Sequence, residues 1–521
     1  MVRVGHEATG TDSGPSDAPS MRDEQRPPAA DEMALGLRLL RDGPVSDAHH
    51  LLLLASGALW RTDVARSREA AVHATLAAWS AGDRDGYLTA LDALCPGAGH
   101  PDGNPSAEEN SSPTDAFWRA YRDGMTSVLH GDFARANALL VPLLNALKTR
   151  QEASRLLSAG TIALMLGDLA TARQTLGAAL AAARSEGASA LLPRVLEHLA
   201  YAELRAGRYH QARAHAEAGL EAACRQPHRN AAAGLSAVLA LAASIAGDPA
   251  TVATHARSAL RTAHAHGLSQ ARTLAEWARA RGELSDGNAE QAAARLAPLV
   301  RAGPRQGHFG LRMMAVPCYV EAAVLAGHDG DAEVEQLIDQ YARWASQGAD
   351  PAAPAVVLRC RALVADDEHS EDLFTAALTH HEAVDSPYEH ARTHLAYGMW
   401  LRRRRRPVEA RPQLRAAVVG FDHCGADVWS GYADAELRAA GETPTVAPDP
   451  GPGPAPLTTL TPQQLRIARS VARGATNREV ARQLSISTRT VEYHLRNIFT
   501  RLGVRSRVAL ARHPQISMSS P

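Results

Sequence analysis

Aromatic residues make up only 4% of the 521 residues, and runs that alternate β-branched with polar residues are nearly absent. A chain with so few strand-forming residues is not expected to build a β-sheet. Alanine and leucine are abundant instead, and both lose little conformational freedom in a helix. The composition therefore predicts an all-α protein that is long enough for several domains.

Cysteine is also scarce, and the five cysteines are widely spaced and never form a CxxC pair. This spacing predicts reduced thiols in the cytoplasm, with neither a disulfide framework nor a zinc site. Residues 1–32 lack the apolar stretch of a signal peptide and are expected to form a disordered leader. One uncharged run, residues 231–247, approaches the length of a membrane span. It is rich in alanine and in register with the repeats below, so we expect a core helix and no membrane partner.

Lys148 is the only lysine, and leucine and alanine precede it where a phosphate-binding loop needs glycine. The sequence therefore excludes an ordinary ATP-binding loop. His390 and His394 have the spacing of a zinc pair but lack the accompanying Glu, and no nucleophile motif is present. We expect no cofactor, no metal and no enzymatic activity.

Acidic residues are missing from one part of the chain. Residues 457–513 contain eleven arginines but only two acidic residues, Glu479 and Glu492, whereas the rest of the chain is acidic overall. A basic terminal segment on an acidic body favours a polyanionic partner for that segment.

Glycines at intervals of 40 residues mark an internal repeat, beginning at Gly167 in "LMLGDLATA" and ending at Gly327 in "VLAGHDGDA". The segment "WLRRRRRPVEA" (400–410) occupies the equivalent position further on. A glycine with positive φ can end one helix, and alanine after the turn lets a second helix pack closely. The repeat thus predicts stacked helical hairpins and is similar to tetratricopeptide repeats.

The domain boundaries follow from composition. We expect one right-handed α-solenoid of nine or ten hairpins over residues 33–441, with a mobile Pro/Gly/Ser-rich insertion at about 96–114. Residues 442–459 carry six prolines and predict an extended linker. A small domain at 460–513 and a disordered tail at 514–521 complete the prediction.

The small domain shows clear helix signals. Pro462 suits the first position of a helix, and Thr476 and Glu479 have the spacing of a capping box. A three-residue turn then leads to a helix from Thr488 to about Arg501. Its apolar residues form one stripe, Val491, Leu495, Ile498 and Leu502. Two helices joined by so short a turn predict a helix-turn-helix whose second helix enters the major groove of DNA.

The segment "LTPQQLRIARSVARGATNREVARQLSISTRTVEYHLRNIFTRLGVRSRVALAR" resembles the LuxR-type DNA-binding domain, which has four helices. Together with the preceding repeats it is similar to the C-terminal half of the LAL regulators, large ATP-binding members of the LuxR family, without their ATPase domain. The resemblance implies a bacterial, cytoplasmic transcription regulator, an activator, that binds promoter DNA as a dimer and works with RNA polymerase.

The resemblance also implies roles for single residues. Base contacts fall chiefly on Glu492, Tyr493 and Arg496, and Arg489 is a further candidate for guanine or phosphate. Phosphate contacts fall on Thr476, Asn477, Ser487, Thr490, His494 and Arg501. The dimer contact falls on the last helix, with Ser506, Val508 and Ala509.

Two residues depart from the family pattern. Gln464 replaces a usual Glu, which we interpret as the loss of a surface pairing of little consequence. Glu492 replaces a usual Lys, so the DNA target of relatives does not transfer to this chain.

Several alternatives stay open. The terminal domain of a tetratricopeptide-type scaffold would bind protein instead of DNA, and region 4 of a sigma factor shares the same helix pair. The five arginines at 402–406 either bind phosphate or form a solvated turn. The repeats either bind a protein or small-molecule ligand in their concave groove or only hold a dimer together.

Overall fold

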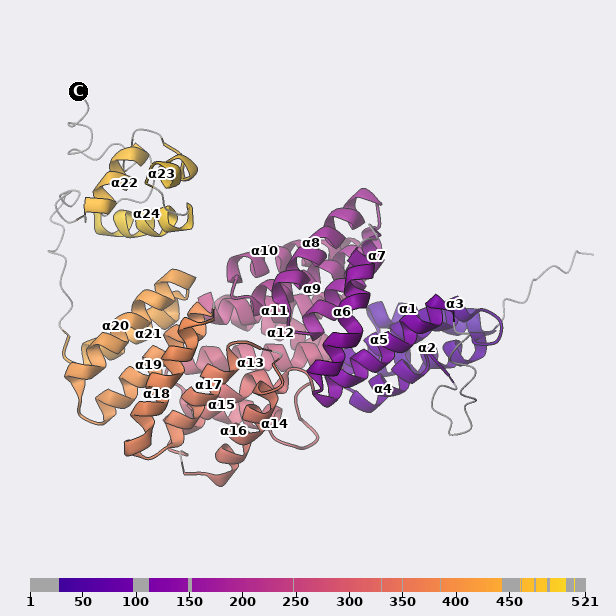
Figure 1. The fold of residues 1–521 in the computed structure, drawn as a ribbon, viewed down its shortest axis with the longest axis horizontal. Helices are drawn as coiled ribbons and strands as arrows, with labels where there is room; N and C mark the ends of the chain where they lie inside the picture. Colours follow the sequence, from indigo (N-terminus) through magenta and orange to yellow (C-terminus); the bar gives the residue numbers. More distant parts are fainter. Residues whose placement is uncertain are drawn as a thin grey trace, which may run out of the picture.

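The computed structural model describes residues 28–96, 112–148, 152–442 (except 247, 329, 349 and 385), 460, 462–472, 475–484, 488–502 and 510. Every regular element within these ranges is a helix, so the predicted all-α class is confirmed. Residues 28–442 form a curved array of paired helices, and a small helical domain follows in the sequence (Figure 1).

The helices of the first half of the array are α1 (Pro28–Asp42), α2 (Val45–Leu59), α3 (Val64–Ala81), α4 (Arg84–Asp92), α5 (Pro113–His130), α6 (Phe133–Lys148), α7 (Ala153–Met165), α8 (Leu169–Ser185), α9 (Leu192–Arg205) and α10 (Tyr209–Arg225). Those of the second half are α11 (Arg229–Ala246), α12 (Pro249–His266), α13 (Ser269–Ser285), α14 (Ala289–Val300), α15 (Arg312–Leu325), α16 (Ala332–Ala345), α17 (Ala353–Val364), α18 (Asp367–Glu382), α19 (Pro387–Arg403), α20 (Pro407–Cys424) and α21 (Asp427–Ala439). A short 3₁₀ turn, Ser189–Leu191, precedes α9.

Within residues 28–442, successive helices pair as hairpins from α1/α2 to α19/α20, and from α7 to α19 each odd-numbered helix also contacts the next odd-numbered one. This is the arrangement of a stacked hairpin repeat, in which each hairpin covers the apolar face of the next. Helix α1 contacts α11, α3 contacts α13, and α11 contacts α21. The array therefore coils tightly enough for helices ten apart in sequence to meet.

Two helices begin earlier than predicted, α1 by more than one helical turn and α5 by only two residues. Helix α1 begins at Pro28, not after residue 32, because Ala29 and Met33 both pack into the core. Helix α5 begins at Pro113, inside the predicted insertion, because the Ser112 hydroxyl caps it by accepting from the Asp115 N–H.

The repeat glycines have the backbone conformation that the sequence predicts. The φ angles of Gly167, Gly207, Gly287 and Gly327 are 77°, 71°, 78° and 85°, while Gly247 lies outside the described residues. Arg405 has a φ of 59° and is the only residue other than glycine with a positive φ among the described residues. It lies in the predicted equivalent turn, so this hairpin keeps the turn geometry without the glycine.

Close approach within the hairpins depends on a second set of glycines. Each of these glycines faces a buried leucine sixteen positions later on the partner helix, and a Cβ atom there would lie 2.5 to 2.7 Å from the leucine Cγ. The pairs are Gly36 with Leu52, Gly124 with Leu140, Gly160 with Leu176, and Gly398 with Leu414. Real Cβ atoms do not approach other atoms so closely, so these positions require glycine for the observed packing.

Helix α11 is the one described helix that is long and apolar enough to cross a membrane by length and composition. It packs as a central core helix, with most of its residues buried against α9, α10, α12 and α13. The predicted run of 231–247 thus lies in register with the repeats.

A buried charge cluster ties together the inner helices of the second half. The Arg392 guanidinium of α19 pairs with Glu321 of α15 and lies 4.0 Å from the ring centroid of Trp429 on α21. Arg392 is only 2% exposed to solvent. The Arg359 guanidinium of α17 donates to Glu389 at 2.7 Å. Since ions buried without a partner are costly, these pairs hold α15, α17 and α19 in one register, and the Trp429 ring adds a contact from α21.

We predict opposite effects for alanine at two glycines of neighbouring helices. Gly160→Ala in α7 places a Cβ 2.5 Å from the fully buried Leu176 and should lower the free energy of unfolding by about 1 to 3 kcal/mol. Gly177→Ala in α8 meets nothing within 4 Å and should raise it by up to about 1 kcal/mol through helix propensity. Urea unfolding followed by circular dichroism measures both, and shifts in the same direction would contradict the packing argument.

We also predict that Arg405→Gly stabilises the repeat domain by about 1 kcal/mol, because glycine removes the steric cost of a positive φ. The neighbouring Arg404 is the matched control. Its φ is −79°, and its side chain pairs with Asp367, so Arg404→Gly should be destabilising. Thermal unfolding of the two variants tests the difference, and equal effects would show that the turn is unstrained.

Candidate nucleic-acid interface and the cavity of the repeat domain

Three helices, α22 (Pro462–Ala472), α23 (Asn477–Leu484) and α24 (Thr488–Leu502), and the helical residue Leu510 enclose a core of their own. Figure 1 shows the three helices in yellow. The buried members of this core are Leu460, Ile467, Ala468, Val471, Val480, Ala481, Val491, Leu495, Ile498, Leu502 and Leu510. Because every member belongs to residues 460–510, the domain buries its apolar side chains without help from the repeats.

The predicted apolar stripe of α24 is confirmed. Val491, Ile498 and Leu502 are completely buried, and Leu495 is 5% exposed. The helix contacts both α22 and α23 with this side. Residues at i, i+4, i+7 and i+11 share one side of a helix, so the opposite side of α24 is not needed for the core of the domain.

The predicted capping box at the start of α23 is confirmed as well. A carboxylate oxygen of Glu479 accepts from the Thr476 N–H at 2.7 Å and from its hydroxyl at 2.8 Å, while the Glu479 N–H donates back to that hydroxyl at 3.3 Å. These hydrogen bonds lower the pKa of Glu479, the backbone one most. One of the two acidic residues of the domain therefore acts at a helix terminus.

The prediction that Gln464 is a surface residue of little consequence is wrong. Its side chain is only 5% exposed, and its carbonyl oxygen accepts a hydrogen bond at 3.1 Å from the guanidinium of Arg501 near the end of α24. The residue is buried because α22 packs against the last turn of α24. Arg501, a predicted phosphate contact, thus also joins two helices of the domain.

Four predicted phosphate contacts have described side chains. Thr476 and Arg501 are exposed, and Asn477 and His494 are half-buried. Burial lowers the pKa of His494, so the ring is neutral at physiological pH and would contact phosphate by hydrogen bonding, not by charge. The remaining predicted residues are outside the described side chains, namely Arg489, Thr490, Glu492, Tyr493 and Arg496 within α24, and Ser487, Ser506, Val508 and Ala509.

The arginine run at 402–406 is largely engaged within the protein. Arg402 donates to Glu436 at 2.8 Å, Arg404 pairs with Asp367, and Arg406 pairs with Glu371 at 2.7 Å. These carboxylates compete with any phosphate, which favours the alternative of a turn, although its arginines are paired with carboxylates and not simply solvated as expected.

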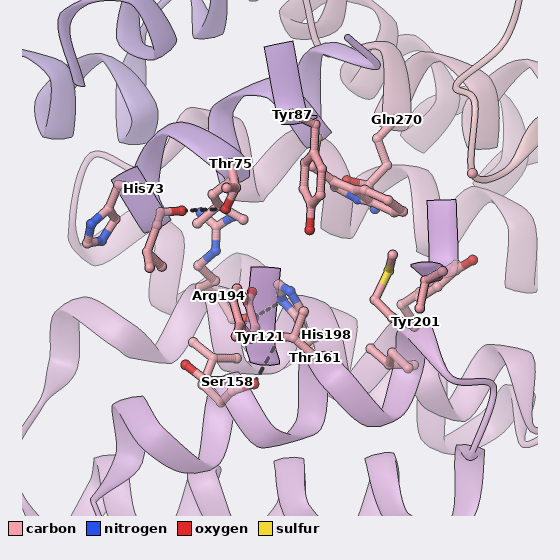
Figure 2. A pocket seen from close by; sticks show the side chains of 18 of the residues that line it. His73, Thr75, Tyr87, Tyr121, Ser158, Thr161, Arg194, His198, Tyr201 and Gln270 are labelled. Atoms are coloured by element: carbon pink, nitrogen blue, oxygen red, sulfur yellow. Dashed lines mark hydrogen bonds between the residues drawn. The ribbon is translucent and has the colours of Figure 1, made fainter. Parts of the chain in front are cut away.

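Sequence reasoning missed the cavity inside the coil of the repeat domain (Figure 2). It has a volume of about 840 Å³, and its wall combines residues of α1, α3, α5, α7, α9 and the segment between α14 and α15. Aromatic side chains form much of the wall, notably Trp79, Trp118, Tyr121, Phe309 and Trp344. Among the described residues, no group of three or more His, Cys, Asp or Glu could hold a metal ion there or elsewhere.

The segment between α14 and α15 closes one side of this cavity. His308 is completely buried, and its Nε2 atom hydrogen-bonds the Trp79 carbonyl at 2.6 Å. Burial lowers the pKa of His308 to about 4. The Phe309 and Trp79 rings pack edge to face, with 5.2 Å between their centroids. The few aromatic residues of the chain would have been the only sequence signal, since residues from 79 to 344 meet here only through coiling.

The family match and the similar protein sequences concern the terminal domain. Residues 458–513 match the family described as "Bacterial regulatory proteins, luxR family". A nitrate/nitrite response regulator protein homolog of Haemophilus influenzae is 44% identical over 53 residues. The nitrate/nitrite response regulator protein NarP of Escherichia coli is 44% identical over 50 residues, and a putative HTH-type transcriptional regulator of Mycobacterium tuberculosis is 41% identical over 51.

Each match covers 10% of this chain, and it covers 26%, 23% and 6% of the three relatives. The chain therefore spans about a quarter or less of their length, and the relationship concerns the small domain alone.

The repeats align with two solved structures only weakly. A Rap protein complexed with Competence and Sporulation Factor gives a TM-score of 0.40 at 11% identity over 80% of this chain and 97% of its own. The TPR domain of P58(IPK) gives 0.21 at 12% over 80% and 100%. Neither likeness relates this chain to the protein concerned. The contacts within the chain and the family match together show a helical-repeat domain joined to a LuxR-type helix-turn-helix domain at residues 458–513.

Proposed function

We propose that this protein is a transcription regulator that recognises promoter DNA through α24. The observation that carries the proposal is the family match of residues 458–513, on a domain in which α23 and α24 follow each other in sequence and pack together. In a helix-turn-helix the second helix lies in the major groove, and residues near its start contact base edges. The buried stripe from Val491 to Leu502 supports α24 in this role, because it leaves the opposite side for DNA.

Electrostatics supports the same assignment. Arg466, Arg469 and Arg482 of α22 and α23 are exposed, as is Arg501 of α24. Glu479 is occupied by the Thr476 cap. The domain thus presents a basic surface with little opposing charge, which suits the phosphates that dominate affinity for DNA.

The finer parts of the proposal rest on the resemblance to LuxR-type regulators. The protein binds paired half-sites as a homodimer through the segment around Ser506, Val508 and Ala509, activates transcription with RNA polymerase, and acts in the cytoplasm. Base contacts are assigned to Arg489, Glu492, Tyr493 and Arg496, and phosphate contacts to Thr476, Asn477, Ser487, Thr490, His494 and Arg501. The repeat domain binds a ligand or partner that controls this activity, and its cavity of about 840 Å³ is the feature that supports such a role.

The competing proposal is a scaffold whose terminal domain binds protein. It lacks a specific supporting observation in the fold, and DNA binding distinguishes the two. Enrichment of discrete promoter fragments from genomic DNA by the full-length protein supports a regulator, and binding that is equal for all sequences contradicts it.

We predict that Arg496→Ala weakens binding of the full-length protein to an enriched promoter fragment by about 1 to 3 kcal/mol, because arginine commonly reads guanine or phosphate in this position of the helix. Gel shifts over a series of salt concentrations measure the effect, and wild-type affinity should fall steeply with salt. Arg184→Ala is the control, since Arg184 is exposed on α8 in the repeat domain. Equal affinities of the wild type, Arg496→Ala and Arg184→Ala for the promoter fragment would show that Arg496 does not contact DNA.

We further predict that Glu492→Lys binds DNA more tightly and discriminates less between sequences. A carboxylate at this position accepts from cytosine and repels phosphate in a wrong register, whereas lysine adds attraction to any phosphate. Glu479→Ala removes the only other acidic residue of the domain and should lower stability by about 0.5 to 2 kcal/mol without changing the sequence preference. Tighter binding of Glu492→Lys with an unchanged preference would show that Glu492 reads no base.

A further inference from the structure

The cavity of the repeat domain carries more positive than negative charge. Four arginines line it, and Glu69 is the only carboxylate among the lining residues. Three of the arginines are already engaged. Arg155 pairs with Glu152 at 2.8 Å, Arg205 lies 3.9 Å from Asp350, and the Arg41 guanidinium donates to the Leu37 carbonyl at 3.2 Å.

Arg194 of α9 is the exception. Among the described residues, none forms a hydrogen bond or ion pair with its guanidinium within the usual limits, although its backbone carbonyl accepts from His198. Figure 2 shows the Arg194 side chain extending from α9 toward Thr75 of α3, across the cavity. The Thr75 hydroxyl donates to the Val72 carbonyl at 2.7 Å, so it stays within its own helix.

The surroundings make this cation unusual. Burial lowers the pKa of Arg194, and the nearby Glu197 raises it in part. Burial also raises the pKa of Glu197 to about 7, so this carboxyl is partly protonated at neutral pH and compensates the guanidinium incompletely. Arg194 is half-buried, and a charged group with so little access to water is stabilised by a counterion, which an anionic group inside the cavity would supply.

His198 adds a second polar position. Burial lowers its pKa to about 4, so the ring is neutral. Its Nδ1 atom lies 2.9 Å from the Arg194 carbonyl, which only accepts, so Nδ1 carries the proton. The Nε2 atom is then an acceptor, and none of the described residues donates to it within hydrogen-bonding distance. Figure 2 shows the ring beside Tyr121 on the cavity wall.

We infer that this cavity binds a small aromatic acid, with the anionic group on Arg194, a ring N–H or hydroxyl on His198, and the flat apolar body against Trp79, Tyr121 and Phe309. The volume of about 840 Å³ is that of a site for a single small molecule. Binding of the acid to the cavity does not depend on the proposed function. The further role of the acid as the signal of a transcription regulator does rest on it.

The test uses 8-anilino-1-naphthalenesulfonate, which has an aromatic body, an N–H and one anionic group, and N-phenyl-1-naphthylamine, which is the same body without the sulfonate. Fluorescence titration of the full-length protein should show one saturable site that prefers the anionic probe. Arg194→Gln should weaken the anionic probe about tenfold, equivalent to about 1.4 kcal/mol, and leave the neutral probe unchanged. Equal affinity of wild type for the two probes, or an equal loss of both in Arg194→Gln, would overturn the assignment of the anion to Arg194.

Two further variants locate the site. Ser158 lines the cavity on α7, so Ser158→Trp should narrow the cavity and weaken binding of both probes, with the helical circular dichroism retained. Arg184→Gln, on the exposed side of α8, should leave the affinity for both probes unchanged. Unchanged binding in a folded Ser158→Trp would place the probe elsewhere and overturn the proposal.

Competition identifies the class of ligand. Displacement of the anionic probe by naphthalene carboxylates and indole carboxylates supports a small aromatic acid, and displacement only by short peptides overturns it. Promoter binding of the same protein preparation is measured in parallel by gel shift. Probe binding without promoter binding would contradict the proposed function alone, and promoter binding without probe binding would contradict this inference alone.

Discussion

The fold depends on the fact that a hairpin of two short helices cannot cover its own apolar face. Each hairpin therefore needs a neighbour, and the buried residues of α9 to α21 merge into one continuous cluster. Small side chains make the contacts close, because glycines such as Gly160 and Gly398 receive a leucine of the partner helix where a Cβ atom would not fit. The array also coils, since α1 contacts α11 and α11 contacts α21.

Coiling brings together polar groups that no local rule could pair. The Asn230 side chain of α11 donates at 2.9 and 3.0 Å to the carbonyls of Leu40 and Gly43, where α1 ends and its last carbonyls lack partners within the helix. His308 likewise reaches Trp79. These contacts close the coil around a space that the side chains do not fill. The cavity is thus a consequence of how the repeats stack, and Arg194 and His198 give it its chemical character.

The two parts of the chain differ in how far their details followed from sequence. In the terminal domain the capping box of Thr476 and Glu479 and the buried stripe of α24 were predictable, because both depend on spacings within one helix. The burial of Gln464 was not, because it depends on where α22 meets the end of α24. In the repeats, the positive φ of Gly167 and its relatives followed from the 40-residue period. The helix starts at Pro28 and Pro113 did not, since composition there suggested loop.

The sequence by itself determined the all-α class, the hairpin period, the break before the small basic domain and the helix pair within it. Helix periodicity, caps and turns act over a few residues, so they are legible along the chain. Only the tertiary structure decided which helices meet after a full turn of the coil, which arginines have carboxylate partners, and that Arg194 faces a cavity without one. Those outcomes depend on the angle at which successive hairpins stack, and small changes of angle add up over many repeats. No short stretch of sequence records that sum.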